Sequence, residues 1–309
     1  MPSAPLLPPG VQVFERGWLS SNNILLTDAD SATLVDSGYV SHSAQTLALI
    51  QQALGPRPLD RLVNTHLHSD HCGGNAALQQ HYPDLQTLIP PGMADDVQAW
   101  RDEALSYEST GQNCPPFRLT GLLEPGSSHR WAGTEWQVHA APGHDPDSVI
   151  LFAPEHRLLI SADALWQNGF GVVFPELMGV AAFAEVADSL DLIERLNPAL
   201  VIPGHGAVFA NVAEALAWAR QKLDAFVRTP EKHARYSAKV LLKFKLLEFG
   251  RIAKSDFRAW ALGMPYLVNL HQQYGAGMDR TTWLDMMLAD LQRSGALHDD
   301  GAMLHDVSN

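Results

Sequence analysis

The sequence predicts an α/β layered domain followed by a small helical domain. Strand-like segments come first and then alternate with helical ones to about residue 227, which is typical of layered α/β domains. Three helical segments and a hairpin-like tail follow. The 309 residues, of which 46% are apolar and 18% charged, allow a sizeable core and exclude a disordered, fibrous or low-complexity protein.

The first domain opens with strands and then alternates. Apolar runs bounded by turn residues predict strands over 11–14, 23–27, 32–36 and 62–65. Ser43 caps a helix whose apolar positions recur every three or four residues, and Gly55 ends it. A second helix begins at Gly73-Gly74-Asn75 and closes before Pro83. Further along we predict a helix over 92–110, an irregular binding loop or lid over 111–135, strands over 136–140, 149–152, 158–161 and 200–202, and helices over 182–196 and 212–227.

The character of the chain changes near residue 228. Helical segments are predicted over 234–248, 254–262 running on towards 273, and 279–294, and a small hairpin over 295–304. Three helices and a hairpin resemble a winged helix, a fold that often binds DNA. We interpret the basic residues between Lys239 and Lys254 as a solvated helix face, because the chain is acidic overall.

Charge and cysteine content restrict the partners and the compartment. The formal net charge of −13, from 21 basic and 34 acidic residues, argues against nucleic acid. Cys72 and Cys114 are too few for a disulfide framework, and we interpret Cys72 as a packed core residue. Residues 1–10 show no secretory signal, and no apolar run is long enough to span a membrane. We therefore expect a cytoplasmic protein with a small-molecule substrate and no membrane or nucleic-acid partner, with a homodimer left open.

The strongest chemical signal is the segment Thr65–Gly74, which reads THLHSDHCGG. It places His66, His68, Asp70 and His71 between a strand and a helix. An extended chain puts His66 and His68 on one side, and Asp70 and His71 then fall in the turn. Imidazoles and a carboxylate that converge in this way suit zinc, iron or manganese.

Three further candidates each follow the end of a predicted strand. His144 lies in Pro-Gly-His-Asp, Asp163 in Ser-Ala-Asp-Ala and His205 in Pro-Gly-His-Gly. Sites in α/β folds gather at the carboxyl ends of strands, so we expect these residues to join the metal motif. Asp36 also follows a strand, and it either supports the metal loop by hydrogen bonds or is a plain turn residue. We assign no role to the nine remaining histidines.

Together these motifs resemble the metallo-β-lactamase superfamily over roughly residues 11–227. The resemblance implies an αββα sandwich for residues 1–227 with two metals at one edge, and a winged-helix-like extension for residues 228–309. It implies that one metal is held by three histidines, the other by Asp70 and two histidines, and that one aspartate bridges both. By this resemblance His66, His68 and His144 would hold the first metal, Asp70, His71 and His205 would hold the second, and Asp163 would bridge both.

The resemblance also implies a reaction. An aspartate at 163 is typical of glyoxalase II-like thioesterases, lactonases, phosphodiesterases and RNase Z-like nucleases, whereas zinc β-lactamases tend to have cysteine or serine there. A glutamate at 68 would have indicated the flavodiiron branch, but His68 is present. We therefore expect a metal-dependent hydrolase, not a true β-lactamase, in which a metal-bridging hydroxide cleaves a small ester, thioester or lactone. Asp70 is the expected catalytic residue that orients the hydroxide or takes its proton.

The cofactor and the substrate pocket complete the hypothesis. We expect two divalent ions per chain, zinc first, with iron or manganese as the other candidates. The alternative functions are a persulfide dioxygenase-like oxidoreductase with one iron and, less favoured, a phosphodiesterase or nuclease. Residues 165–170 and their surroundings combine aromatic and amide side chains, as binding walls do. We expect substrate contacts from Trp166, Asn168 and Phe174.

Overall fold

A computed structural model describes residues 7–275 and 277–307 of the chain. It forms two compact units. The first unit comprises Met1–Leu105 and Asn113–Asp224, and the second comprises Ser106–Gln112 and Ala225–Asn309, within the described residues. The chain therefore leaves the first unit at residue 106 and re-enters it at 113, an excursion that lies inside the first domain of the sequence-based boundary.

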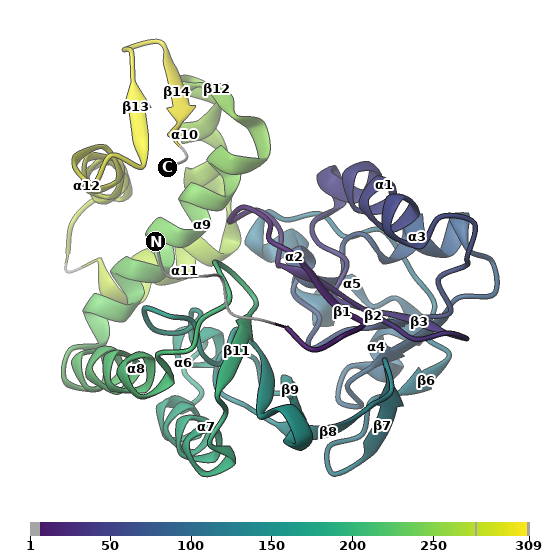
Figure 1. Cartoon of the computed structure of the whole chain (residues 1–309). Coiled ribbons are helices and arrows are strands. Elements are labelled where there is room, and N and C mark those ends of the chain that lie inside the picture. The colour runs from purple at the N-terminus through teal and green to yellow at the C-terminus, as the bar shows by residue number, and fades with distance from the viewer. Residues whose placement is uncertain (1–6, 276, 308–309) are drawn as a thin grey trace. The chain divides into compact units, whose positions relative to one another are not determined.

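Two sheets form the centre of the first unit (Figure 1). In one, an antiparallel start is followed by parallel strands, in the order β1 (Val11–Phe14), β2 (Asn23–Thr27), β3 (Ala32–Val35), β4 (Arg61–Val63), β5 (Gln86–Ile89), β6 (Gly121–Leu122). In the other, only the first pair of the order is parallel: β11 (Leu200–Pro203), β10 (Leu158–Ala162), β9 (Val149–Ala153), β8 (Thr134–Ala140), β7 (Ser128–Trp131).

The cores of the first unit lie on both faces of the first sheet. One apolar cluster joins side chains of the two sheets, among them Val35, Val63, Trp136 and Ile160, and each of these is almost fully buried. A second cluster joins the first sheet to two helices, α1 (Ser43–Leu54) and α3 (Asn75–His81). Burial of strands on both faces is expected of a sheet covered by helices and a second sheet. The αββα arrangement expected from the sequence is thereby confirmed.

The remaining helices of the first unit are mostly short. They are η1 (Val40–His42), α2 (Ser69–Cys72), α4 (Ala94–Ala99), α5 (Asp102–Leu105), η3 (Pro154–His156), α6 (Phe174–Leu177), α7 (Phe183–Leu196) and α8 (Val212–Arg228), which runs on into the second unit. Among the described residues, no helix has both the length and the apolar composition needed to cross a membrane.

Two local predictions are wrong. The helix predicted over 92–110 is broken at Trp100 and Ser106, whose φ angles of 47° and 58° lie in the left-handed region that a helix cannot include. The segment 111–135, predicted as irregular, contains β6 and β7. These strands of two and four residues are too short for the period-two pattern to reveal them, and β5 also escaped the prediction.

The second unit is a helical domain with a small sheet. Its elements in chain order are η2 (Glu108–Thr110), α9 (Pro230–Phe249), β12 (Arg251–Ala253), α10 (Lys254–Gly263), α11 (Pro265–Tyr274), α12 (Arg280–Arg293), β13 (Leu297–Asp299) and β14 (Met303–Asp306). The sheet order is β12-β14-β13, so the predicted hairpin gains a third strand. Pro265 at the first position of α11 ends α10, where the sequence indicated one continuing helix.

Candidate metal centre

The carboxyl ends of four strands supply the candidate metal ligands. β4 leads to His66, His68 and the short helix α2, which carries Asp70 and His71. β8, β10 and β11 are followed by His144, Asp163 and His205, respectively. In the folded chain these seven side chains meet in three overlapping groups whose donor atoms lie within 4.8 Å of one another. Asp70 and His71 thus lie in the turn after the strand, as expected, and this turn is the short helix α2.

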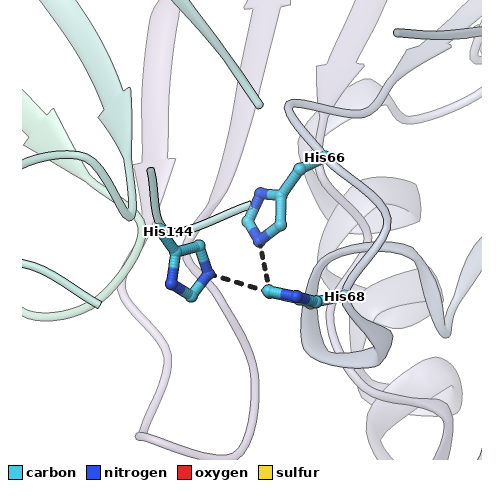
Figure 2. Close-up of side chains that lie close together, drawn as sticks. All are labelled: His66, His68 and His144. Carbon is cyan, nitrogen blue, oxygen red and sulfur yellow. Dashed lines mark hydrogen bonds between the residues drawn. The ribbon is translucent and has the colours of Figure 1, made fainter. Parts of the chain in front are cut away.

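The first cluster consists of His66, His68 and His144 (Figure 2). Nδ1 of His68 lies 3.0 Å from Nε2 of His66 and 2.8 Å from Nε2 of His144. His66 and His144 are buried, and His68 is partly exposed. Three ring nitrogens therefore point at one spot, as the expected ligand set of a first metal requires.

The protonation of the first cluster suits a metal. Burial lowers the pKa of His66 well below its ordinary value and those of His68 and His144 to about 4. Neutral imidazole is the form that binds metals. Nδ1 of His144 donates a hydrogen bond to the carbonyl oxygen of Val172 at 2.5 Å, so in the neutral ring Nε2 keeps its lone pair for the cluster.

The second cluster consists of Asp70, His71 and His205. Nε2 of His205 donates to Oδ2 of Asp70 at 3.1 Å. Burial opposes ionisation of Asp70, but the imidazoles of His71 and His205 hold its pKa below the ordinary value. Burial likewise opposes the charged form of His71, but the carboxylates of Asp36, Asp163 and Asp70 outweigh it and hold its pKa well above the ordinary value. A positive charge is thus stabilised where Nε2 of His71 lies.

Asp163 lies between the two clusters. Its Oδ2 is 3.4 Å from Nε2 of His144, and its Oδ1 is 3.5 Å from Nε2 of His71 and 3.9 Å from Nε2 of His205. Burial raises its pKa, but the three neighbouring imidazoles hold it well below the ordinary value. One carboxylate oxygen therefore faces each cluster, which is the geometry of a bridging ligand.

Asp36 supports the second cluster through the imidazole of His71. Its Oδ2 accepts a hydrogen bond from Nδ1 of His71 at 2.8 Å, and its two oxygens accept further bonds from the amide and hydroxyl of Thr65. The backbone at Asp36 has a φ of 58°, a strained conformation that is tolerated where surrounding contacts demand it. Of the two interpretations of Asp36, support of the metal loop is the one that its contacts favour.

Two glycines and one asparagine hold the loops at the site. A Cβ at Gly204 would overlap Oδ1 of Asp163, and one at Gly171 would overlap Nδ1 of His144. The buried side chain of Asn22 donates to the carbonyls of Pro203 and Gly206 and so clamps the loop that carries His205. Nothing in the pattern around Asn22 signals this role, because its partners are more than 180 residues away.

The three expected substrate residues have different surroundings in the structure. Nε1 of Trp166 donates to Oδ1 of Asp163 at 3.1 Å, so this side chain holds the carboxylate as well as lining the site. Phe174 packs edge-on against His68 and His144. Asn168 is exposed in the turn closed by Trp166 and Gly169.

Three residues near the clusters escaped the sequence analysis. Trp18 is 54% exposed, stacks on the ring of His205 and meets Trp166 edge-on. Nζ of Lys222, on α8, donates to the carbonyl of Phe170 at 2.8 Å, and burial lowers its pKa to about 8. Oδ2 of Asp145 lies 3.7 Å from Nε2 of His68. Only Asp145, next to His144, could have been singled out from the sequence.

The residues present fit metal ions on two independent grounds. Nε2 of His71 is buried and has no hydrogen-bond partner among the described residues, although it points at two carboxylates. Such an atom is costly to bury unless something binds it. The donor set of imidazoles and carboxylates is one that zinc, iron and manganese accept.

The family follows from the sequence pattern as well as from the geometry. The pattern that describes the metallo-β-lactamase superfamily matches residues 16–205, well over half of the chain. The chain belongs to the metallo-β-lactamase superfamily. Proteins similar to this chain include hydrolases of two kinds, in line with the resemblance inferred from the motifs.

Curated superfamily proteins resemble this chain at low identity. Hydroxyacylglutathione hydrolase of Xanthomonas euvesicatoria is 32% identical over 60% of this chain and 60% of its own length. The acyl-coenzyme A thioesterase MBLAC2 of Gallus gallus is 27% identical over 63% of this chain and 76% of its own. Nitric oxide reductase of Moorella thermoacetica is 27% identical over 64% and 53%. The chain thus spans less than two thirds of two of these three relatives.

Solved structures share the fold of this chain. A β-lactamase domain protein from Burkholderia ambifaria superposes with a TM-score of 0.60 at 22% identity, over 99% of this chain and 96% of its own. At that identity it shows the fold alone. The protein TTHA1623, solved in a di-iron-bound form, is 28% identical with a TM-score of 0.52, over 66% of this chain and 96% of its own.

Proposed function

We propose that this chain is a hydrolase that uses two divalent metal ions to cleave a small thioester or ester. The observation that carries the proposal is the position of Asp163, whose two oxygens face two separate clusters of donors. A site for a single ion would not need a buried carboxylate between two sets of imidazoles. The di-iron form of TTHA1623 supports a pair of ions at a site of this fold.

The thioester class is supported by the relatives. Two of them are named as hydrolases of acyl thioesters, one of hydroxyacylglutathione and one of acyl-coenzyme A. The position of Phe174 and Trp166 beside the clusters adds apolar surface for an acyl group. Lactones and oxygen esters undergo the same carbonyl chemistry and belong to the same proposal.

The chain's own groups have separate tasks in the reaction. When bound, a pair of divalent ions lowers the pKa of a water molecule and polarises the carbonyl oxygen. Asp70 is ionised, so its Oδ2 can orient the water and accept its proton. The water oxygen bonds to the acyl carbon, the carbon–sulfur bond breaks, and the thiol leaves with a proton. The net reaction yields a carboxylic acid and a thiol.

The experiment combines metal analysis with a substrate panel. The full chain is purified without added metal, its metal content is measured, and acyl thioesters, nitrophenyl esters, lactones and phosphodiesters are tested. Two ions per chain and thioester or ester hydrolysis are the expected result. One iron per chain with oxygen uptake on a persulfide would instead identify an oxidoreductase. Hydrolysis of phosphodiesters alone would identify a phosphodiesterase and overturn the proposal.

A further inference from the structure

The only two cysteines of the sequence meet in the first unit. Cys72 and Cys114 are 42 residues apart, yet their Sγ atoms lie 3.7 Å from each other, and neither is in a disulfide. Cys72 is the last residue of α2 and is fully buried. Cys114 is partly exposed in a segment without helix or strand. Of the two residues, only Cys114 is exposed to solvent.

The two sulfurs differ in how firmly the backbone holds them. The backbone that follows α2 is tightly packed, because a Cβ at Gly73 would overlap the backbone of Ser69 and one at Gly74 would overlap that of Ser37. Cys114 lies in a stretch of exposed and half-exposed residues without helix or strand, next to Asn113, whose amide donates to Oη of Tyr39 at 3.1 Å. We therefore expect Cys114, which lies outside any helix or strand, to be the residue that moves when the two sulfurs approach.

The distance to be closed is short. A disulfide has an S–S length near 2.05 Å, so the sulfurs must approach by about 1.6 Å. A side-chain rotation at Cys114 with a small shift of its irregular segment supplies a movement of that size. No rearrangement of the sheets or of α2 is needed.

We propose that Cys72 and Cys114 form an oxidisable dithiol that hydroperoxides convert to an intramolecular disulfide. The Cys114 sulfur, which solvent reaches, attacks the peroxide O–O bond and becomes a sulfenic acid, while one water is released. The Cys72 sulfur then attacks the Cys114 sulfur, the S–OH bond breaks, and a second water leaves. Two thiols and one hydrogen peroxide thus yield one disulfide and two waters.

The crosslink joins two functionally distinct segments. Cys72 directly follows His71, and Cys114 lies two residues beyond Gln112, where the chain returns from the second unit to the first. The disulfide would fix this return point to the helix that carries Asp70 and His71. It leaves every candidate metal ligand unmodified, so it is a modification site separate from the proposed hydrolysis.

The test exposes the full-length protein to hydrogen peroxide and counts thiols after denaturation. We expect both thiols to disappear, the mass to fall by two hydrogen atoms, and reductant to reverse both changes. Trypsin cuts after Arg61, Arg101 and Arg118, so the disulfide will link peptides 62–101 and 102–118. This readout needs no enzymatic activity, so it can fail while the hydrolase proposal stands, and the reverse.

Two variants make the result decisive. Cys114→Ser alters a partly exposed residue and should retain one thiol that peroxide oxidises far more slowly than in the parent chain. Cys72→Ala should let Cys114 oxidise to the sulfenic acid and beyond, without loss of two hydrogen atoms. Disulfides between chains, or a Cys114 that over-oxidises in the parent chain while the Cys72 thiol persists, would overturn the proposal.

Discussion

The two clusters of the candidate metal centre differ in their charge. The first, His66, His68 and His144, contains imidazoles whose pKa values burial lowers, so its three nitrogens are neutral. The second pairs the ionised carboxylate of Asp70 with His71, whose pKa is raised by surrounding carboxylates. One site thus places a set of neutral donors beside a set that contains an ionised carboxylate.

The difference in charge gives the two clusters different effects on a bound ion. A neutral trio of nitrogens leaves the charge of a divalent ion uncompensated, which favours a strongly polarising ion. The second cluster, with Asp70 and the hydrogen bond from His71 to Asp36, compensates that charge and places an acceptor for a proton beside it. Asp163 couples the two, since it turns one oxygen to each.

The largest effect is expected from Asp163→Ala, which removes the carboxylate between the clusters. Both ions should bind more weakly, and hydrolysis should fall by more than the 10- to 100-fold typical of losing an outer-shell partner. Metal content per chain and the rate on the best substrate measure this. Asp188→Ala on the exposed face of α7 is the matched control and should retain both. Full metal stoichiometry in Asp163→Ala would show that the bridging assignment is wrong.

Ligand losses confined to one cluster should separate the two. His144→Ala is expected to lose the ion of the first cluster and His205→Ala that of the second, each retaining about one ion per chain because the other donors are intact. Elemental analysis after gel filtration measures the remainder. If both variants lose all metal, the clusters bind cooperatively and the division into two sites does not hold.

A smaller effect is expected from Asp36→Asn, which weakens the acceptor that orients His71. Loss of such a partner typically costs 10- to 100-fold in metal affinity. We expect that loss at the second cluster and an unchanged affinity at the first, measured by chelator competition in two steps. Equal weakening of both steps would mean that Asp36 supports the fold of the whole loop and not the second cluster.

The smallest effect concerns Lys222 and is a dependence of stability on pH. Its pKa is about 8 in the folded chain and 10.5 ordinarily, so between these values the unfolded state binds the extra proton. Stability of the parent chain should therefore rise with pH across this window relative to Lys222→Met, by roughly 1–3 kcal/mol. Urea unfolding of both chains at pH 8 and pH 10.5 measures the difference. A constant difference would show that Lys222 keeps its ordinary pKa.

Much of the centre could be predicted because its ligands follow strand ends. His66, His68, Asp70 and His71 share one short segment, and His144, Asp163 and His205 each come after an apolar run. Local pattern suffices there, since a strand end is visible in the sequence and parallel strands end at a common edge. The helix that follows Ser43 was likewise predicted from apolar periodicity, and its apolar side chains lie in the second core.

Other features could not be predicted because they depend on long-range contacts. The surroundings of Trp166 and Asn168 differ although they are two residues apart, since the indole donates to Asp163 and the amide is exposed. The strands β5, β6 and β7 depend on the sheets into which they fit, which override weak local propensity. Lys222, Asn22 and Trp18 come to the site from distant segments.

The sequence by itself determined which residues can bind metal and which superfamily the fold belongs to. Both can be recognised from short motifs that follow the ends of strands. Only the tertiary structure decided that Asp163 faces two clusters of unlike charge. It alone brought Cys72 and Cys114, 42 residues apart, to 3.7 Å. The reason is physical: residue type and spacing set the chemistry available, whereas distance, burial and charge arise when separate segments pack together.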